Sequence, residues 1–284
     1  MISKSLKRKW NAIATAFGMT PQGVFVPHRY AQSLLPDVPV PELQPLFRSA
    51  QPVMTDLLTE MAGHPDRWQA FSGANPPYPR WEQSWFPGLD GAAAYSMVRK
   101  HRPRRILEIG SGHSTRFLAR AILDGGLDTD LICIDPAPRA SIAALNVQFF
   151  SRTLQETELS ALPELAPGDV LFIDSSHLAL PGSDVDLIFS RLLPRLPAGV
   201  FVHIHDILLP DGYPEAWRWR VYGEHLPVAS WLGSGGLRVV FSSAWVRSRM
   251  ADTLPPVVAA IPRPSDAVET SLWTVKIAPA ITEN

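Results

Sequence analysis

The sequence predicts an α/β fold, with a doubly wound, mostly parallel sheet of seven strands and an N-terminal helical cap. Short apolar runs alternate with amphipathic helical stretches after residue 88, and two further apolar runs follow towards the end of the chain. Strands that alternate with helices form a parallel sheet with helices on both faces. The composition changes near residue 88, which predicts a cap over residues 1–87 and one larger domain over residues 88–284.

The cap is expected to be helical and broken by prolines. Apolar residues over 46–61 recur at steps of three and four, as on one helix face, and a glycine and a proline within 63–65 end that helix. Residues 73–80 contain three prolines and predict an extended connector. The basic start over residues 1–9, with a short, interrupted apolar run after it, predicts an amphipathic helix rather than a signal peptide, and hence a cytoplasmic protein.

The domain is expected to contain four helices and seven strands. The strands are short apolar runs, and the helices place apolar residues three or four positions apart. Gly125-Gly126 stop the second helix, and Ser183 with Asp186 resembles a capping box at the start of the third. The expected helices are 92–101, 115–123, 184–193 and 214–226, and the expected strands are 105–109, 131–134, 147–150, 170–173, 200–204, 237–241 and 272–277.

Composition excludes several classes of function. The 284 residues include 26 Lys and Arg and 27 Asp and Glu, and this balance gives no reason to expect a nucleic-acid partner. Cys133 is the only cysteine, which excludes an internal disulfide and a cysteine-built zinc site. No apolar stretch approaches the about 20 residues that cross a bilayer, so we expect no membrane partner. The sequence leaves the oligomeric state open and is compatible with a homodimer.

The most informative segment links the first predicted strand to the next helix. Gly110-Ser111-Gly112 allows a tight turn and a close approach of a ligand to the backbone, and Ser114 opens the helix. Asp135 ends the second strand, 25 residues after Gly110, where a carboxylate can accept hydrogen bonds from two ribose hydroxyls. We expect a nucleotide-type site here. The alternative is a glycine turn that only links strand to helix.

The same loop favours a ligand that carries no phosphate. A dinucleotide fingerprint has a third glycine where this chain has Thr115, and Glu108 would bring negative charge towards a pyrophosphate. Both features disfavour NAD. They suit a positively charged ligand such as S-adenosylmethionine.

The order Glu108-x-Gly110-x-Gly112-x-Ser114, followed by Asp135, resembles the first two motifs of the class I S-adenosylmethionine-dependent methyltransferases. The resemblance covers about residues 88–278 and implies a Rossmann-like methyltransferase fold with S-adenosylmethionine as cofactor. The residues that it places around the cofactor are Glu108, Gly110, Ser111, Gly112, Ser114, Asp135 and Asp174.

Polar residues also end the fourth and fifth predicted strands. Asp174 and His177 follow the fourth, and the fifth runs into His203, His205 and Asp206. This pattern resembles small-molecule O-methyltransferases that act on catechols and macrolide sugars, in which these two strands are neighbours. The resemblance implies that His177 is the general base between two acids, Asp174 and Asp206, and that the substrate is a small molecule. His203 lies deeper in its strand and is expected to be structural.

The presence of a divalent metal ion is left open. In those enzymes acids hold a magnesium-type ion, whereas here His205 stands where an acid is expected. Imidazole suits zinc, iron, nickel or manganese better than magnesium. Asp174, His205 and Asp206 are therefore candidate metal ligands, and the alternative is that the two acids orient the substrate directly.

Two segments near the carboxyl edge of the sheet are rich in aromatic residues. An aromatic wall with a few polar groups is typical of a small-molecule pocket, and the alternative for each residue is ordinary packing. The residues are Trp81, Trp85, Phe86, Trp217, Trp219, Tyr222 and Trp231.

The predicted function is methylation of an oxygen on a small metabolite, in which the substrate hydroxyl attacks the methyl group while His177 removes its proton. One alternative is an NAD-type oxidoreductase, which Thr115 and Glu108 disfavour. Another is a non-catalytic cofactor-binding module, which the set of Asp174, His177 and Asp206 disfavours.

Overall fold

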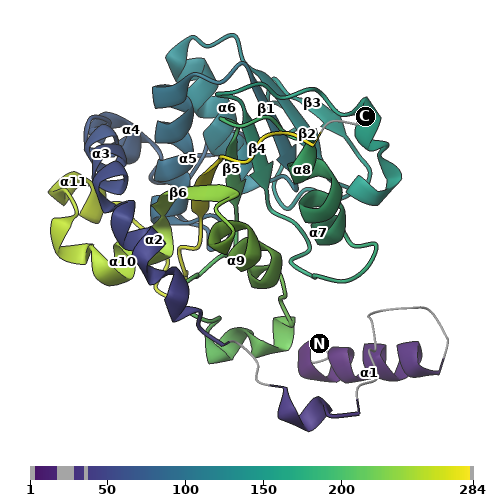
Figure 1. Ribbon diagram of the computed structural model, residues 1–284. Coiled ribbons are helices and arrows are strands. Elements are labelled where there is room, and N and C mark those ends of the chain that lie inside the picture. The colour runs from purple at the N-terminus through teal and green to yellow at the C-terminus, as the bar shows by residue number, and fades with distance from the viewer. Residues whose placement is uncertain (1–3, 18–28, 35–37, 282–284) are drawn as a thin grey trace. The chain divides into compact units, whose positions relative to one another are not determined.

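A seven-stranded sheet forms the centre of the computed structural model, which describes residues 4–17, 29–34 and 38–281. The strands are β1 (Arg105–Ile109), β2 (Asp130–Ile134), β3 (Gln148–Phe150), β4 (Val170–Ile173), β5 (Phe201–Ile204), β6 (Leu237–Ser242) and β7 (Leu272–Lys276). Their order across the sheet is β3-β2-β1-β4-β5-β7-β6, and β7 runs antiparallel to both of its neighbours (Figure 1). The other pairs are parallel, which confirms the predicted mostly parallel sheet.

Helices cover both faces of this sheet (Figure 1). α5 (Gly88–His101) and α6 (His113–Gly125) pack against each other on one face, and α7 (Asp184–Leu187) and α8 (Leu193–Arg195) lie on the other. Because both faces are covered, all four residues of β4 are apolar and buried instead of alternating. The remaining helices of this part are α2 (Gln44–Ser49), α3 (Gln51–Ala62), α4 (Pro65–Ala70), α9 (His225–Gly233), α10 (Ser243–Arg249) and α11 (Pro256–Ala259).

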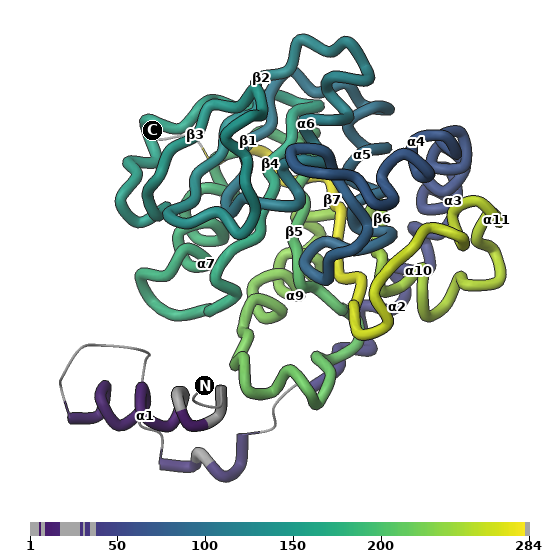
Figure 2. The backbone as a smooth tube through the Cα atoms, turned by 180° about the vertical axis from the view of Figure 1, so that it is seen from behind, coloured from purple at the N-terminus to yellow at the C-terminus, as the bar shows by residue number. Residues whose placement is uncertain are grey.

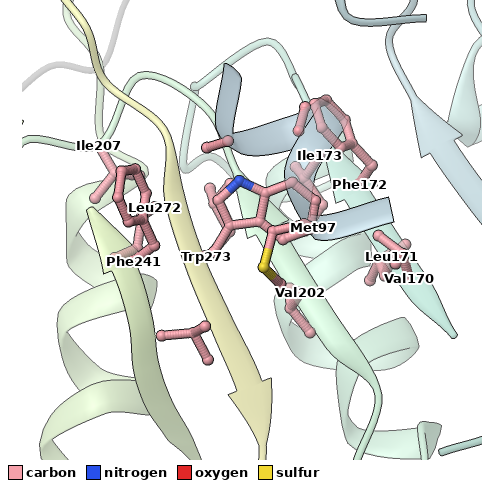
Figure 3. Packing of buried hydrophobic residues seen from close by; sticks show 14 of the residues in the cluster. Met97, Val170, Leu171, Phe172, Ile173, Val202, Ile207, Phe241, Leu272 and Trp273 are labelled. Atoms are coloured by element: carbon pink, nitrogen blue, oxygen red, sulfur yellow. The ribbon is translucent and has the colours of Figure 1, made fainter. Parts of the chain in front are cut away.

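The apolar core joins β7 to the parallel part of the sheet. Figure 3 shows Trp273 of β7 among Met97 of α5, Val202 of β5 and Phe172 of β4. The rings of Trp273 and Phe172 are both fully buried, with their centroids 5.9 Å apart. Buried aromatic residues each remove a large apolar area from water, so this contact contributes strongly to the stability of the sheet.

Four of the parallel strands end on an isoleucine, and the register places these isoleucines in one row. Ile109 pairs with both Ile134 and Ile173, and Ile173 pairs in turn with Ile204. The residues directly after this row therefore meet at the carboxyl edge of the sheet, where ligands bind in open α/β folds. They are Gly110, Asp135, Asp174 and His205.

The predicted helix over 46–61 is interrupted in the structure. It consists of α2 and α3, which meet at Ala50. Pro52 lies in the first turn of α3 and has no N–H group, so it cannot continue the hydrogen-bond ladder of α2. Gly63 ends α3, as expected.

The prediction of one helix over 214–226 is wrong. Glu215–Arg220 form a short 3₁₀ helix, η6, and α9 begins only at His225. Val221 between them has a left-handed backbone with a φ of +55°, which stops the helix. The turn that results carries Tyr222 and Glu224 to the loop after β4.

The residues before position 88 fall into two parts. Residues 38–87 belong to the same compact unit as the sheet, and α3 packs there against α5 and β6 (Figure 2). The helix predicted near the start is α1 (Lys4–Ala16), in a separate unit over residues 1–36, and the end of the apolar run after it lies outside the described residues. A functional division at residue 87 stays a prediction. None of the helices in the described ranges is long and apolar enough to cross a membrane.

Candidate functional site

The loop between β1 and α6 is fixed at the sheet edge by backbone hydrogen bonds. The Gly110 N–H donates to the Ile134 carbonyl at 2.9 Å, and the Asp174 N–H donates to the Ile109 carbonyl at 2.8 Å. Gly110 has a φ of +82°, and a Cβ at this position would overlap the carbonyl oxygen of Asp174. Glycine alone therefore allows the loop to pass so close to the end of β4.

Glu108 is enclosed by its neighbours beneath this loop. Its side chain is fully buried, and the hydroxyls of Ser114 and Thr115 donate to its two carboxylate oxygens at 2.6 and 2.7 Å. Burial raises the pKa of Glu108 to about 7, although the hydroxyl donors lower it. Glu108 and Ser114 thus bind each other and tie the first turn of α6 to β1, and their direct contact with a cofactor stays a prediction.

We expect Glu108→Gln to remove a pH-dependent loss of stability. Folding raises the pKa of Glu108 from its usual value of 4.5 to about 7, so the folded protein keeps a proton that the unfolded chain has released. The free energy of unfolding of the wild type should therefore fall as the pH rises from about 4.5 through about 7, by at most roughly 3 kcal/mol. Urea unfolding across this range measures it. Asp128→Asn, at an exposed acid, should keep the wild-type slope, and the same slope in Glu108→Gln would contradict the assignment.

Asp135 lies beside the glycine loop and shapes it. Its Oδ2 accepts hydrogen bonds from the Ser111 N–H at 2.6 Å and from the Ser111 hydroxyl at 3.2 Å, and its Oδ1 accepts from the Ala137 N–H at 2.6 Å. The residue remains partly exposed at the end of β2. It can therefore order the loop and still accept a hydrogen bond from a ligand at the same edge.

Asp174, His177 and Asp206 meet beyond the ends of β4 and β5. The Nε2 atom of His177 lies 3.5 Å from Asp174 Oδ1 and 3.5 Å from Asp206 Oδ2. Asp174 is the most accessible of the three, with 34% of its side chain exposed. On the other side of the imidazole ring, Nδ1 lies 2.8 Å from Oε2 of Glu224, a fully buried carboxylate. The ring is thus held between acids on both sides.

His205 lies in a similar position beside the same two acids. Its Nδ1 is 3.5 Å from Asp174 Oδ1 and 3.7 Å from Asp206 Oδ1, and its Nε2 is 3.5 Å from Oδ2 of the buried Asp90. The same Nε2 lies 3.3 Å from the hydroxyl of Thr270, which donates to Asp206 at 3.1 Å. Two imidazoles therefore share one pair of carboxylates, and each has a further buried acid behind it.

The electrostatics of this cluster favour protonated imidazoles. Burial alone would lower the pKa of His177, but the carboxylates of Asp174 and Glu224 outweigh it and raise this pKa to about 10. Burial alone would also lower the pKa of His205, but Asp206 and Asp174 hold this pKa well above its usual value. The two imidazoles in turn hold the pKa of Asp174 well below its usual range, although burial acts the other way. A proton that reaches His177 is therefore strongly held.

Two residues of the cluster have a left-handed backbone. His177 has a φ of +61° and Asp206 a φ of +54°, in a region that side chains with a Cβ adopt rarely. Such a conformation costs free energy and persists where the surrounding contacts impose it. One of these contacts is a hydrogen bond of 2.8 Å from the Gly223 N–H to the carbonyl of His177.

The candidate metal ligands Asp174, His205 and Asp206 do meet, but as ion pairs. In the part of the chain that the structure describes, no group of three or more His, Cys, Asp or Glu side chains could hold a metal ion. This arrangement does not support the candidate metal site.

Part of the predicted aromatic wall lies against the cluster. The ring of Phe86 is 5.3 Å from that of His205, and the ring of Tyr222 is 4.5 Å from that of His177, between centroids. Trp217 lies 6.2 Å from Tyr222 in an edge-on arrangement. Phe86 and Tyr222 thus contact the two imidazoles directly, and Trp217 contacts Tyr222.

The other aromatic residues are distributed differently. Trp81 was expected in the wall but is fully buried in the core, where its Nε1 donates to the Trp68 carbonyl at 2.7 Å. Trp85 is 54% exposed and stacks on the guanidinium of Arg139 at 4.2 Å, near the glycine loop. Trp219 is largely exposed and Trp231 packs against Gly236 at the end of α9.

Residues 107–207 match a family model described as "Methyltransferase domain". This segment of the chain is similar to methyltransferase domains. The matched segment begins in β1, passes through the glycine loop and both polar strand ends, and stops just after Asp206. No protein with a curated description matches the chain.

Several solved structures are similar to most of the chain at low identity. The O-methyltransferase TomG from Streptomyces achromogenes, involved in tomaymycin synthesis and solved with S-adenosylmethionine, is 19% identical over 98% of this chain and 100% of its own, with a TM-score of 0.41. The methyltransferase PaMTH1 from Podospora anserina, bound to S-adenosylhomocysteine, is 15% identical over 90% and 100%, with a TM-score of 0.42. An O-methyltransferase from Bacillus cereus is 14% identical over 78% and 91%, with a TM-score of 0.42.

The sheet brings most of the predicted site residues to one edge. Gly110, Ser111 and Gly112 form the loop, and Asp135 and Asp174 lie beside it. Asp174 joins the loop to the cluster around His177 and Asp206. His203 stays apart, as expected for a structural residue: its Nε2 lies 2.9 Å from the Ser271 hydroxyl and its ring stacks on Phe172 at 3.7 Å.

Sequence reasoning missed the two buried acids behind the histidines. Asp90 lies in the first turn of α5, where it accepts hydrogen bonds from the backbone N–H groups of Thr270 and Ser271. Glu224 was included in a predicted helix. Both lie outside the matched segment. They reach the histidines only through packing between distant segments of the chain.

Proposed function

We propose that this protein transfers the methyl group of S-adenosylmethionine to an oxygen of a small molecule, with His177 as the general base. The observation that carries the proposal is the contact between the two parts of the site. Gly110 packs directly on the backbone of Asp174, and the side chain of Asp174 lies 3.5 Å from His177 Nε2. A cofactor on the glycine loop would thus have a base at the same edge of the sheet.

The residues around the loop fit a cofactor that is positively charged and carries no phosphate. The carboxylates of Asp135 and Asp174 lie beside it, and they would repel a pyrophosphate but attract a sulfonium ion. Asp135 would accept hydrogen bonds from the ribose hydroxyls. When bound, S-adenosylmethionine supplies an electrophilic methyl group.

The neutral form of His177, which the raised pKa of about 10 makes the minor form at neutral pH, would accept the proton of the acceptor hydroxyl at Nε2. As the oxygen bonds to the methyl carbon, the carbon–sulfur bond breaks and S-adenosylhomocysteine leaves. The O–H electron pair stays on the oxygen, and the positive charge that appears on the imidazole faces Asp174 and Asp206, each 3.5 Å from Nε2. Both acids stabilise that charge. Alignment of the two reactants contributes as well, because correct positioning alone can lower a barrier by about 7–11 kcal/mol.

Calorimetry on the purified protein tests the cofactor assignment. We expect S-adenosylmethionine and S-adenosylhomocysteine to bind and NAD to show no binding. Binding of NAD in place of both nucleosides would support an oxidoreductase and overturn the proposal.

Asp135→Ala tests the ribose contact. We expect it to weaken the binding of S-adenosylmethionine by the loss of one or two charge-assisted hydrogen bonds, at roughly 1.5–3 kcal/mol each. The carboxylate that would accept these bonds is lost, and the Ser111 N–H loses its acceptor as well. Asp130→Ala, at the exposed opposite end of β2, is the matched control and should bind as the wild type does. Equal affinity in the two variants would remove Asp135 from the cofactor site.

A further inference from the structure

Glu224 is a buried acid whose contacts converge on the candidate base. It is fully buried, directly precedes α9 and lies outside the matched family segment. Its Oε2 lies 2.8 Å from His177 Nδ1, and its Oε1 accepts a hydrogen bond of 2.9 Å from the Ser175 hydroxyl. A buried carboxylate is tolerated where its oxygens are satisfied, and here each of the two oxygens has a partner.

The backbone also ties this segment to the loop after β4. The Gly223 N–H donates to the carbonyl of His177 at 2.8 Å. A Cβ at Gly223 would lie only 3.1 Å from the Cβ of Ala179, so the two chain segments are closely packed. The separation of Glu224 from His177 is therefore fixed by backbone contacts as well as by the side-chain bond.

This contact distinguishes the two nitrogens of the ring. A carboxylate accepts and cannot donate, so Glu224 requires a hydrogen on Nδ1 of His177. When the ring is neutral, Nε2 is then the nitrogen with the free lone pair, and it faces Asp174 and Asp206. The ring nitrogens of His205 have no contact this short among the described residues, because the nearest partner of the ring is the Thr270 hydroxyl, 3.3 Å from Nε2.

We propose that Glu224 is the positioning residue of this methyltransferase: it holds the Nδ1–H of His177 and presents Nε2 to the acceptor hydroxyl. The inference rests on the proposed function, because it assigns to Glu224 the orientation of the base in that reaction. The imidazole then enters the reaction in one orientation and one tautomer, as in carboxylate–imidazole pairs of hydrolases.

Glu224→Gln tests this role, because it keeps the size of the side chain and removes its charge. We expect kcat to fall on the order of 10²- to 10⁴-fold, while the KM of the acceptor and the Kd of S-adenosylmethionine change less than about threefold. The matched control is Glu215→Gln, at an exposed acid of η6, which should keep the wild-type kcat. A wild-type kcat in Glu224→Gln would overturn the positioning role.

Proton NMR gives a second readout that does not depend on turnover. The wild type should show an exchange-protected, downfield imidazole N–H signal that disappears in His177→Ala and moves upfield in Glu224→Gln. An unchanged signal in Glu224→Gln would overturn the proposed contact. Failure of the wild type to bind S-adenosylmethionine would instead overturn the proposed function, so the two failures are distinguishable.

Discussion

His177→Ala is expected to lower kcat for methyl transfer by about 10²- to 10⁴-fold, the usual contribution of a positioned base. The affinity for S-adenosylmethionine should barely change, because Nε2 of His177 faces Asp174 and Asp206 while the glycine loop is held by separate hydrogen bonds. Turnover with an identified acceptor and calorimetry with the cofactor measure the two effects separately.

Two further variants give this experiment its controls. His64→Ala removes a histidine that lies 3.3 Å from Glu60 on α3, and it should leave kcat unchanged. His205→Ala tests the other imidazole of the cluster. Retained turnover in His177→Ala together with a large loss in His205→Ala would transfer the role of the base to His205.

Gly110→Val is expected to abolish cofactor binding and to destabilise the fold by roughly 3 kcal/mol or more. The new Cβ would overlap the carbonyl oxygen of Asp174, and a β-branched residue resists the φ of +82°. The end of β4 or the loop itself must move, and either movement displaces Asp174 from the site. Calorimetry and thermal unfolding measure both consequences.

Gly126→Val separates strain from overlap. Gly126 also has a left-handed backbone, with a φ of +52° at the end of α6, but a Cβ there would meet nothing within 4 Å. We expect this variant to lose about 1 kcal/mol of stability and to bind S-adenosylmethionine normally. Normal binding in Gly110→Val as well would show that the loop is not the cofactor site.

The sheet and its polar edge could be predicted because their signals are local. The strands β1, β2, β4 and β5 are short apolar runs, and each is followed directly by the glycine or polar side chain at the edge, as with Ile109 and Gly110 or Ile173 and Asp174. Parallel strands share one direction, so residues that follow them meet without any knowledge of side-chain packing.

The rest of the site depends on packing between distant segments. Glu224 reaches His177 only because Val221 interrupts a stretch that reads as one helix, and a left-handed valine has no signal in the sequence. Asp90 comes from a helix start and meets a loop 180 residues later. The sequence grouped His205 with Asp174 and Asp206, which do lie beside its ring, but it gave no sign of Asp90, the third acid there.

The position of β7 delays the completion of the sheet during translation. β7 leaves the ribosome after the other six strands of this sheet, yet it lies between β5 and β6. About 70 residues separate the end of β5 from the start of β7, which takes roughly 4–14 s at usual elongation rates. Until then the edge of β5 is unpaired, and Thr270 and Ser271 have not reached the histidines of that strand. The nascent chain therefore exposes an unpaired strand edge late in synthesis, and the cluster around His205 is completed only after β7 has paired.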